Sequence, residues 1–497
     1  MTATDLDATF RASAGSVAGS DERTPLAVDL DGTLAKSDGL IDAVAKAVLR
    51  TPKHIPTLLG ALMRGRLAFK SALADLGSYQ PQSIPLREDL VAYLQEQKAA
   101  GRALHLITAS PQEIADAVAA RVQAFDSAVG SRDGLNLKGP AKARYLQEQF
   151  PDGFSYAGND RSDLEVWRHA SSAITVAAPV SVERAVAKLG VPVERSFKQP
   201  RAGIMTWLRL LRMHQWSKNV LMFVPLALAH RYGDAAALLQ VALAFLCMGF
   251  VASATYIIND LSDLDADRRH ATKRYRPLAS AEISVGAGIV VAVLLGMAGM
   301  TGALLLDRWF ALALGVYVAL TLAYSLRLKA IALLDVFVLG LLYTLRIVMG
   351  IVLLHVPPSP WLLVFSLFFF FSLSMAKRHV EIVRAFARGE TGRIKGRGYL
   401  GTDAPLTLSL GVSSTSVAVM LLFLYVANDA YPVGVYRHPQ WLWVISPLVF
   451  LWTTRIWLKS HRGRLDDDPI NFALRDPPSL LLGVLVVLAF ALAAFWP

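Results

Sequence analysis

The sequence predicts an α/β domain followed by an all-α domain that lies in a membrane. About the first 200 residues alternate short apolar strands with helical stretches, which is typical of a parallel sheet covered by helices. The remainder contains long apolar runs that approach the roughly 20 residues a helix needs to cross a bilayer. The content of 54% hydrophobic residues among 497 is therefore an average over two unlike parts.

The first element is a polar N-terminal segment. Residues 1–23 contain no apolar run of the kind found in a signal peptide, and we expect them to be disordered. Residues 24–190 are expected to form the α/β domain. Its first strand lies within residues 24–34, and further strands are predicted at Ala103–Ile107 and Ser155–Ala157. Ligands of a parallel sheet sit beyond the carboxyl ends of its strands, so the polar residues after each strand mark a candidate site.

Two carboxylates separated by one residue follow the first strand, in the run Asp29-Leu30-Asp31-Gly32-Thr33. Such a pair suits a nucleophile and an acid/base group. The run resembles the first motif of the haloacid dehalogenase (HAD) superfamily, and the similarity covers about residues 24–190. The resemblance implies a Rossmann-like fold, a helical cap at about residues 37–100, and phosphatase activity.

The resemblance also implies roles for individual residues. Asp29 would be the phosphorylated nucleophile and Asp31 the general acid/base. Thr108 would hold the phosphoryl group. Lys138 would be the lysine of the third motif, with Lys142 as the less favoured alternative.

A Mg²⁺ site is implied by the same superfamily. Its ligands would be Asp29, Asp31 and Asp163. This chain has Asn159 where the superfamily usually has an aspartate. That departure leaves open an inactive domain that serves as a scaffold or regulator.

The membrane domain is expected at residues 206–497, after a linker at residues 191–205. We predict about nine transmembrane helices there. The longer apolar runs are Leu238–Ile258, Val285–Leu306, Ala332–Leu354 and Leu480–Phe495, and the shorter candidates are Val220–Ala229 and Phe310–Tyr324.

The net charge of +11 is concentrated in alternate loops of the membrane domain. The intervening loops are nearly bare of Lys and Arg, so the positive-inside rule places the basic loops in the cytoplasm. This distribution explains the charge without nucleic-acid binding, for which we see no motif. We therefore expect an integral protein of a bacterial inner membrane, with the HAD-like domain and both candidate sites on the cytoplasmic side.

An acidic run directly follows the apolar run Val251–Ile258. On a helix, Asp260, Asp263 and Asp267 would share one face. Clustered carboxylates suit Mg²⁺ that also binds substrate phosphates, and acidic groups at the end of a membrane helix usually mark function. The basic residues just downstream suit the same phosphates; they are Lys273, Arg274 and Arg276. This run predicts a diphosphate site at the membrane surface.

The order of these motifs resembles the UbiA prenyltransferase superfamily over about residues 205–495. The acidic run from Asn259 to Asp267 matches its first acidic motif. The run from Arg212 to Asn219, which contains Lys218, matches its basic entry segment. The run from Tyr324 to Lys329, followed by Asp335, matches the approach to its second motif.

The second motif departs from the pattern of prenyltransferases that act on aromatic acceptors. Those enzymes usually carry two acids four residues apart, but here Asp335 is followed by Leu339. The chain instead continues to Tyr343 and Arg346. This pattern, together with Lys377-Arg378-x-x-Glu381, is similar to the branch of decaprenyl-phosphate phosphoribosyltransferases.

This branch implies a bifunctional enzyme that uses phosphoribosyl pyrophosphate and a polyprenyl phosphate lipid. The lipid phosphate would attack the sugar and release pyrophosphate, with Asp260 and Asp263 as catalytic groups and Asp267 as a further Mg²⁺ ligand. The substrate-binding residues expected are Asn259, Lys218, Lys273, Arg274, Arg276, Lys329, Tyr343, Arg346, Lys377 and Arg378. Lys377 and Arg378 would bind the lipid phosphate.

The fusion of the two domains predicts sequential chemistry on one lipid. The HAD-like domain would remove the 5-phosphate of the product and leave polyprenyl-phospho-ribose. The alternatives are a prenyltransferase for an aromatic acceptor with a regulatory HAD-like domain, a phosphatase for free phosphoribosyl pyrophosphate, and a transporter. The lipid length and the oligomeric state stay open.

Overall fold

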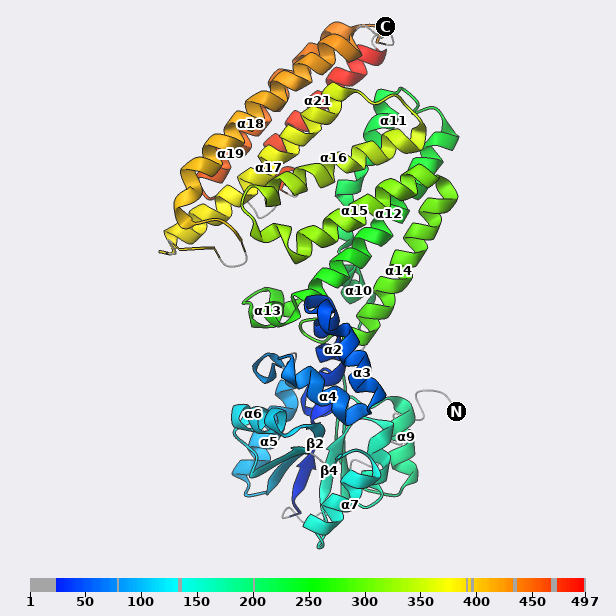
Figure 1. Cartoon of the computed structure of the whole chain (residues 1–497), viewed down its shortest axis with the longest axis vertical. Helices are drawn as coiled ribbons and strands as arrows, with labels where there is room; N and C mark the ends of the chain where they lie inside the picture. Colours follow the sequence, from blue (N-terminus) through cyan, green and yellow to red (C-terminus); the bar gives the residue numbers. More distant parts are fainter. Residues whose placement is uncertain are drawn as a thin grey trace. The chain divides into compact units, whose positions relative to one another are not determined.

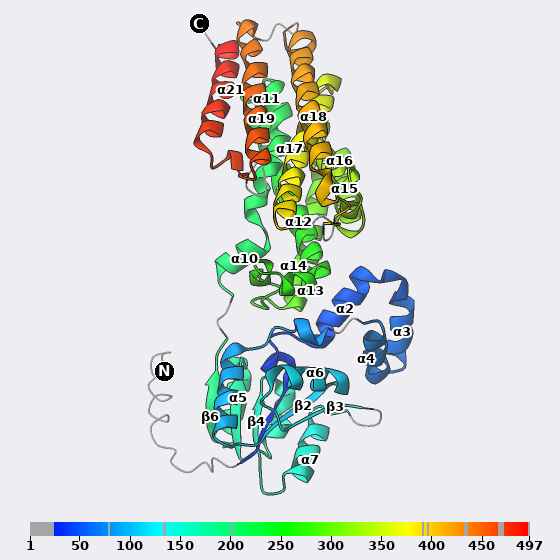
Figure 2. The ribbon, with the colours of Figure 1, turned by 90° about the vertical axis from the view of Figure 1, so that its left-hand side faces the viewer.

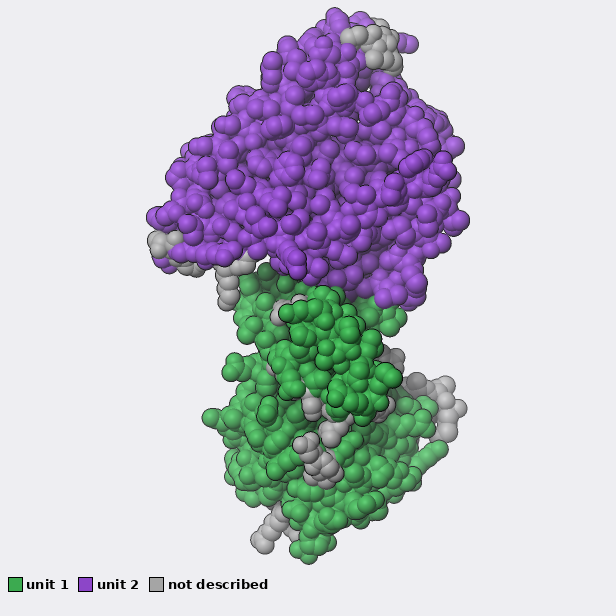
Figure 3. Space-filling view, viewed as in Figure 1, with its two compact units in different colours: residues 1–210, 260–290 green, residues 211–259, 291–497 purple. Residues whose placement is uncertain are grey.

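The computed structural model describes residues 24–495 except 78–79, 133–135, 200–201, 390–391, 395–396, 432–435 and 466–471. The expected disordered segment, residues 1–23, lies outside the described residues. The chain forms two compact units, shown in different colours in Figure 3. The first unit contains the chain up to Leu210 and the segment Asp260–Val290, and the second contains Leu211–Asn259 and Val291–Pro497.

The first unit is built around a six-stranded sheet in the order β3-β2-β1-β4-β5-β6. All of its neighbouring strands are parallel. The strands are β1 (Leu26–Val28), β2 (Leu104–Pro111), β3 (Ser127–Ser131), β4 (Ser155–Gly158), β5 (Ser172–Val176) and β6 (Val193–Phe197). This sheet confirms the prediction of a parallel α/β domain.

Strand β1 has a core on each face. Leu26 and Val28 pack in one buried cluster with α5 (Glu88–Ala99) and α6 (Gln112–Val122). Ala27 points to the opposite cluster, which contains residues of the helices α7 (Pro140–Gln149), α8 (Leu164–Trp167) and α9 (Val180–Lys188). The alternation follows from the period of two in a strand. Figure 1 shows α5 and α6 on one side of the strands β2 and β4 and α9 on the other, and Figure 2 shows the strands in the order β6, β4, β2, β3.

Three further helices lie between β1 and α5. They are α2 (Gly39–Arg50), α3 (Ile55–Met63) and α4 (Arg66–Asp75), and Figure 1 shows them next to one another. Ala43, Ala47, Leu58 and Leu73 form their small shared core. This three-helix group occupies the segment for which a helical cap is predicted.

One correction concerns the predicted linker at residues 191–205. Val193–Phe197 form the edge strand β6, which pairs with β5. Only Phe197 of this strand is buried, because an edge strand exposes most of its side chains. The five residues therefore lack the apolar pattern of a central strand. Helix α10 (Ile204–Leu210) begins within the same segment.

The second unit is helical, and the described residues contain eight helices long and apolar enough to cross a membrane. They are α12 (Ala235–Ser262), α14 (Val285–Leu306), α15 (Arg308–Leu326), α16 (Leu334–Leu354), α17 (Pro360–Ala387), the span Gly401–Ala430 that contains α18 (Ala404–Tyr425), the span Pro439–His461 that contains α19 (Ile445–His461), and α21 (Pro477–Phe495). The ends of α12 and α14 extend into the first unit.

The prediction of about nine spans is thus one too many for the described residues. The candidate Val220–Ala229 does not form a single membrane helix. A 3-10 helix (Met213–Phe223) gives way there to the short α11 (Val224–Leu228), which carries Pro225 in its first turn. Proline lacks a backbone donor and starts a new helix at this point. The other short candidate, Phe310–Tyr324, lies within α15 and does form a span.

Candidate functional site

The first candidate site lies at the carboxyl end of β1. The carboxylate of Asp29 is 2.6 Å from the ammonium group of Lys142, which is in α7. Lys142 also lies 3.0 Å from the hydroxyl oxygen of Tyr156 on β4. Lys138 is exposed, whereas Lys142 is only 3% exposed and faces Asp29. For a lysine beside Asp29 the geometry therefore favours Lys142, the alternative, over Lys138.

Asp31 is held by two hydrogen bonds on different oxygens. The backbone N–H of Gly39 donates to Oδ1 over 2.9 Å, and the hydroxyl of Ser110 donates to Oδ2 over 2.7 Å. Ser110 in turn donates its backbone N–H to the hydroxyl of Thr108. The predicted residues Asp31 and Thr108 thus lie in one connected network, together with Ser110, which the sequence did not single out.

Asp163 completes the strand-end site from the loop after β4. One carboxylate oxygen accepts from the hydroxyl of Tyr156 over 2.8 Å. The other accepts from the backbone N–H groups of Asn159 and Asp160, each over 2.9 Å. These bonds fix the carboxylate in the loop that faces Asp29.

The turn between Asp29 and Asp31 fits closely against Asn159. The hydroxyl of Thr33 donates to Oδ1 of Asn159 over 3.2 Å. Gly32 has φ +75°, and a Cβ there would lie 2.3 Å from Nδ2 of Asn159. The positive φ favours glycine at this position, and another residue would also displace the side chain of Asn159.

Burial controls the charge of Asp29. It raises the pKa of this carboxyl from 3.8 to about 7, with the charges of Asp163 and Asp31 adding to the rise and Lys142 opposing it. Burial also raises the pKa of Tyr156 well above 10. The concentration of carboxylates around Asp29 disfavours negative charge, so a cation bound there would be stabilised. The oxygen donors fit the hard ion Mg²⁺.

The second candidate site is the acidic segment of the first unit. Helix α12 ends at Ser262, and α13 (Leu264–Arg269) begins after Asp263. The expectation of one continuous helix is thus wrong at Asp263, where φ is −93° and ψ is 7°. Serine and aspartate both compete with helix backbone bonds, which favours a break here.

Asp260 and Asp267 nevertheless lie close together across this break. One guanidinium nitrogen, Nη1 of Arg276, is 3.1 Å from Asp260 and 2.5 Å from Asp267. Both carboxylates are buried, with exposed fractions of 4% and 3%. The backbone N–H of Asp267 donates to the carbonyl of Asp263 over 2.9 Å, which connects the third acid to the same turn. Lys273 and Arg274 follow in an exposed turn.

The chemistry of this donor set fits Mg²⁺. Among the described residues, no group of three or more His, Cys, Asp or Glu stands in an arrangement that holds a metal by itself. Mg²⁺ is usually bound by one or two carboxylates together with substrate phosphates, and two carboxylates meet at Arg276. Asp260 and Asp267 could hold the ion, Asp263 in the adjacent turn could be a further ligand, and Arg276 would stay next to the phosphates.

A cationic cluster lies inside the second unit. Lys218 and Arg346 stand 5.6 Å and 5.5 Å from the centre of the Tyr343 ring. Arg346, only 4% exposed, donates to the side chain of Asn219 over 3.1 Å and to the hydroxyl of Tyr317 over 3.0 Å. The structure thus brings three predicted residues together and adds two partners. Asn219 belongs to the entry segment, but Tyr317 gave no signal in the sequence.

Arg378 has a different environment from its neighbour Lys377. Its Nε lies 2.9 Å from Oδ2 of Asp335, and Nη1 pairs with Glu381. The hydroxyl of Tyr399 donates to the other oxygen of Asp335 over 2.8 Å. Arg378 is 1% exposed and Asp335 is fully buried. This geometry does not favour the prediction that Arg378 binds the lipid phosphate.

The other predicted residues of the second unit lie toward the ends of its helices. Asn259 is half-buried near the C-terminal end of α12, and Lys377 is half-buried in the C-terminal half of α17. Lys329 is half-buried in a short 3-10 helix (Leu328–Ala330) after α15.

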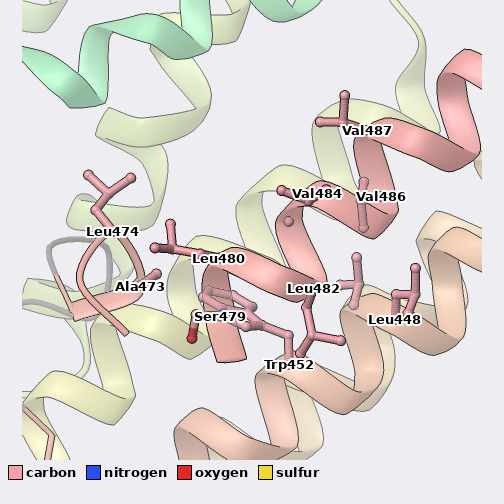
Figure 4. Close-up of a pocket in the computed structure, with 12 residues that line it drawn as sticks. Leu448, Trp452, Ala473, Leu474, Ser479, Leu480, Leu482, Val484, Val486 and Val487 are labelled. Atoms are coloured by element: carbon pink, nitrogen blue, oxygen red, sulfur yellow. The ribbon is translucent and has the colours of Figure 1, made fainter. Parts of the chain in front are cut away.

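An apolar groove of about 570 Å³ lies between α19 and α21. Figure 4 shows Trp452 on one wall and Leu480, Leu482 and Val484 on the other. Its lining suits hydrocarbon, and none of the predicted site residues lines it.

Eight apolar spans and charged groups at the helix ends define an integral membrane protein. The UbiA prenyltransferase family matches residues 220–475. That match covers more than half of the chain, and the chain therefore belongs to the UbiA prenyltransferase family.

Three relatives are informative. The chain is 47% identical over 474 residues to the uncharacterized protein y4nM of Sinorhizobium fredii, covering 95% of this chain and 92% of the relative. It is 35% identical to the nodulation protein NoeC of Azorhizobium caulinodans, over 58% of this chain and 93% of NoeC. It is 31% identical to the decaprenyl-phosphate phosphoribosyltransferase of Mycobacterium tuberculosis, again over 58% of this chain and 93% of the relative.

Proposed function

We propose that this protein transfers a 5-phosphoribosyl group from phosphoribosyl pyrophosphate to a polyprenyl phosphate. The observation that carries the proposal is the meeting of Asp260 and Asp267 at Arg276, next to the basic turn with Lys273 and Arg274. Its support in sequence is the 31% identity over 291 residues to a decaprenyl-phosphate phosphoribosyltransferase.

The transfer forms one bond and breaks one. An oxygen of the lipid phosphate attacks the anomeric carbon of the ribose, and the bond from that carbon to pyrophosphate breaks. When bound, Mg²⁺ would neutralise charge that develops on the leaving pyrophosphate. Asp260, Asp263 and Asp267 would hold the ion, and Lys273, Arg274 and Arg276 would hold the phosphates of the donor.

Cationic groups of the second unit would bind further negative charge. Lys218 and Arg346 both lie over the ring of Tyr343, and two cations at one ring suit an anionic ligand. Lys377 would bind the lipid phosphate, and Lys329 and Asn259 would contribute polar contacts. Arg378 is left out because it pairs with Asp335 and Glu381.

We further propose that the α/β domain is a HAD-type phosphatase that acts on the transferase product. Asp29 would attack the 5-phosphate, and Asp31 would donate a proton to the departing ribose oxygen. Water would then release the phosphate from Asp29, with Asp31 as the base. Lys142 would balance the charge of the phosphorylated aspartate, and Thr108 would contact the phosphoryl group. The products are polyprenyl-phospho-ribose and inorganic phosphate.

Both steps would take place on the cytoplasmic side. This assignment rests on the basic residues that gather in alternate loops of the membrane domain. Phosphoribosyl pyrophosphate is a soluble, highly charged donor, so a site on that side also meets its substrate.

The experiment is a product analysis with the purified full chain in detergent. Polyprenyl phosphate and labelled phosphoribosyl pyrophosphate are supplied with Mg²⁺, and lipids are identified by mass spectrometry. We expect polyprenyl-phospho-ribose from the wild type and its 5-phosphate from Asp29→Asn. Absence of any ribosylated lipid would refute the transfer, and a product from a prenyl diphosphate and 4-hydroxybenzoate would assign the alternative. Accumulation of the 5-phosphate lipid by the wild type would refute the second step alone.

A further inference from the structure

Within the first unit, helix α2 forms a buried charge network with helix α13. The ammonium group of Lys46 is 2.6 Å from Oδ1 of Asp265, and Nη2 of Arg268 is 2.8 Å from Oδ2 of Asp42. Each helix contributes one acidic and one basic side chain, so each ion pair joins an acid of one helix to a base of the other. The hydroxyl of Ser83 adds a hydrogen bond of 2.8 Å to Asp265.

These ion pairs differ from ordinary surface pairs in their burial. The four side chains have exposed fractions of 7%, 1%, 4% and 6% for Lys46, Asp265, Arg268 and Asp42. Surface pairs contribute little, but removing one partner of a buried pair leaves an uncompensated charge and is strongly unfavourable. The network therefore specifies how α13 lies on α2 more sharply than apolar contact would.

The network alternates with the predicted metal ligands along α13. Asp265 lies between Asp263 and Asp267, and Arg268 directly follows Asp267. Asp267 contacts Arg276, whereas Asp265 and Arg268 contact α2. One short helix of six residues thus carries two sets of charged side chains with different partners.

The N-terminus of α2 contacts the strand-end site. The backbone N–H of Gly39, the first residue of α2, donates to Asp31 over 2.9 Å. Asp38 caps the same helix end by accepting from the N–H groups of Leu40 and Ile41. This helix of 12 residues therefore contacts Asp31 at its N-terminus, and it contacts α13 through Asp42 in its first turn and Lys46 about one turn further along.

We propose that Asp42 and Lys46 of α2 are positioning residues for the acidic segment. They hold α13 so that Asp263 and Asp267 present their carboxylates to Mg²⁺ and the diphosphate of the donor. This role rests on the proposed transferase function. The α/β domain would then have a second function, because its helix α2 would position the acidic motif of the transferase. Helix α2 lies outside residues 220–475, which match the UbiA family.

The test compares three full-length variants. Lys46→Met and Asp42→Asn each remove one charge from the network. Glu194→Gln is the control and removes a charge from the ion pair of Arg102 and Glu194. This pair lies in the same unit, and its side chains are 5% exposed for Arg102 and 16% exposed for Glu194. Neither residue belongs to α2 or α13. Transfer is measured against Mg²⁺ and against phosphoribosyl pyrophosphate, and hydrogen exchange is followed over residues 263–270.

For Lys46→Met and Asp42→Asn we expect two constants to rise by roughly 10-fold or more: the Mg²⁺ concentration for half-maximal transfer and the KM for phosphoribosyl pyrophosphate. Losses of this size are typical when residues that orient metal ligands are replaced. Their exchange over residues 263–270 should accelerate. Glu194→Gln should leave both properties unchanged. Restoring the pair with reversed charges, Asp42→Arg with Arg268→Asp, should recover much of the loss.

Two outcomes would overturn the inference. In the first, Lys46→Met and Asp42→Asn show the hydrogen exchange and the Mg²⁺ dependence of the wild type. In the second, Glu194→Gln changes both properties as much as these two variants do, which would indicate a general loss of rigidity. A wild type without transfer activity would instead refute the proposed function. The exchange measurement would then still decide whether α2 holds α13.

Discussion

Lys142 lies 2.6 Å from the carboxylate of Asp29, although the two residues are 113 positions apart in the chain. The contact joins α7 to the end of β1 and is almost fully buried. It is the closest charge to the predicted nucleophile, and it makes Lys142 the residue that would neutralise a phosphorylated Asp29.

The two lysines considered for the proposed phosphatase site offer a matched test. Lys142→Met should reduce hydrolysis of the 5-phosphate by about 100-fold or more, the scale of losing one electrostatic partner of a reacting group. Lys138→Met should retain nearly full activity because Lys138 is exposed. Release of inorganic phosphate from the ribosylated lipid measures both. A larger loss for Lys138→Met would restore the original assignment from the sequence.

Stability should depend on pH through Asp29. Its pKa in the folded protein is about 7, above the ordinary 3.8, so the folded state binds the proton more tightly than the unfolded state. The contribution of this group to stability is therefore fully present below pH 3.8 and is lost as the pH rises through 7. In the presence of a chelator, thermal unfolding of the wild type should show this loss, on the order of 1–3 kcal/mol between pH 5 and 8.

The neutral variant Asp29→Asn provides the control. It mimics the protonated carboxyl, so its stability should change less between pH 5 and 8, and at pH 8 it should exceed that of the wild type. Mg²⁺ should reduce the difference by stabilising the ionised form. Parallel pH profiles for the two proteins would contradict the raised pKa.

The acidic segment predicts a selective loss of transfer. Asp263→Ala should reduce transfer by at least about 100-fold, because a ligand of the Mg²⁺–diphosphate complex is removed. Glu282→Gln is the control from the same segment, since Glu282 forms an exposed pair with Arg209. Transfer is followed with labelled donor, and circular dichroism reports the helices. Normal transfer by Asp263→Ala would remove this residue from the site.

Periodicity and composition predicted much of the fold. The predicted run Val285–Leu306 has the same bounds as helix α14. These 22 residues are almost all apolar and are flanked by polar residues, so the change in polarity marks both ends of the helix. The parallel sheet followed from short apolar strands that end in polar turns. Strand β6 was missed because it is an edge strand whose polar side chains face outward.

The sequence could not predict which side chains the charged residues contact in the folded protein. The acids of the first motif were recognised, but their contact with Arg276 depends on how α13 turns after the break at Asp263. Lys138 precedes α7 whereas Lys142 lies in its first turn, and the packing of α7 on the sheet brings Lys142 to Asp29. The same holds for Arg378, whose partner Asp335 is on another helix.

Lys377 and Arg378 are adjacent on α17, yet they should respond differently to substitution. Arg378 is buried against Asp335, so Arg378→Met leaves a carboxylate without its guanidinium partner and should destabilise the second unit by about 3–5 kcal/mol. The double variant Arg378→Met with Asp335→Asn should recover most of that loss, because the unpaired charge is gone. Lys377→Met should lower the unfolding temperature less than Arg378→Met does and should raise KM for the polyprenyl phosphate. Unfolding in detergent and transfer kinetics separate the two residues, and an unchanged unfolding temperature for Arg378→Met would show that the ion pair is not what holds α16 to α17.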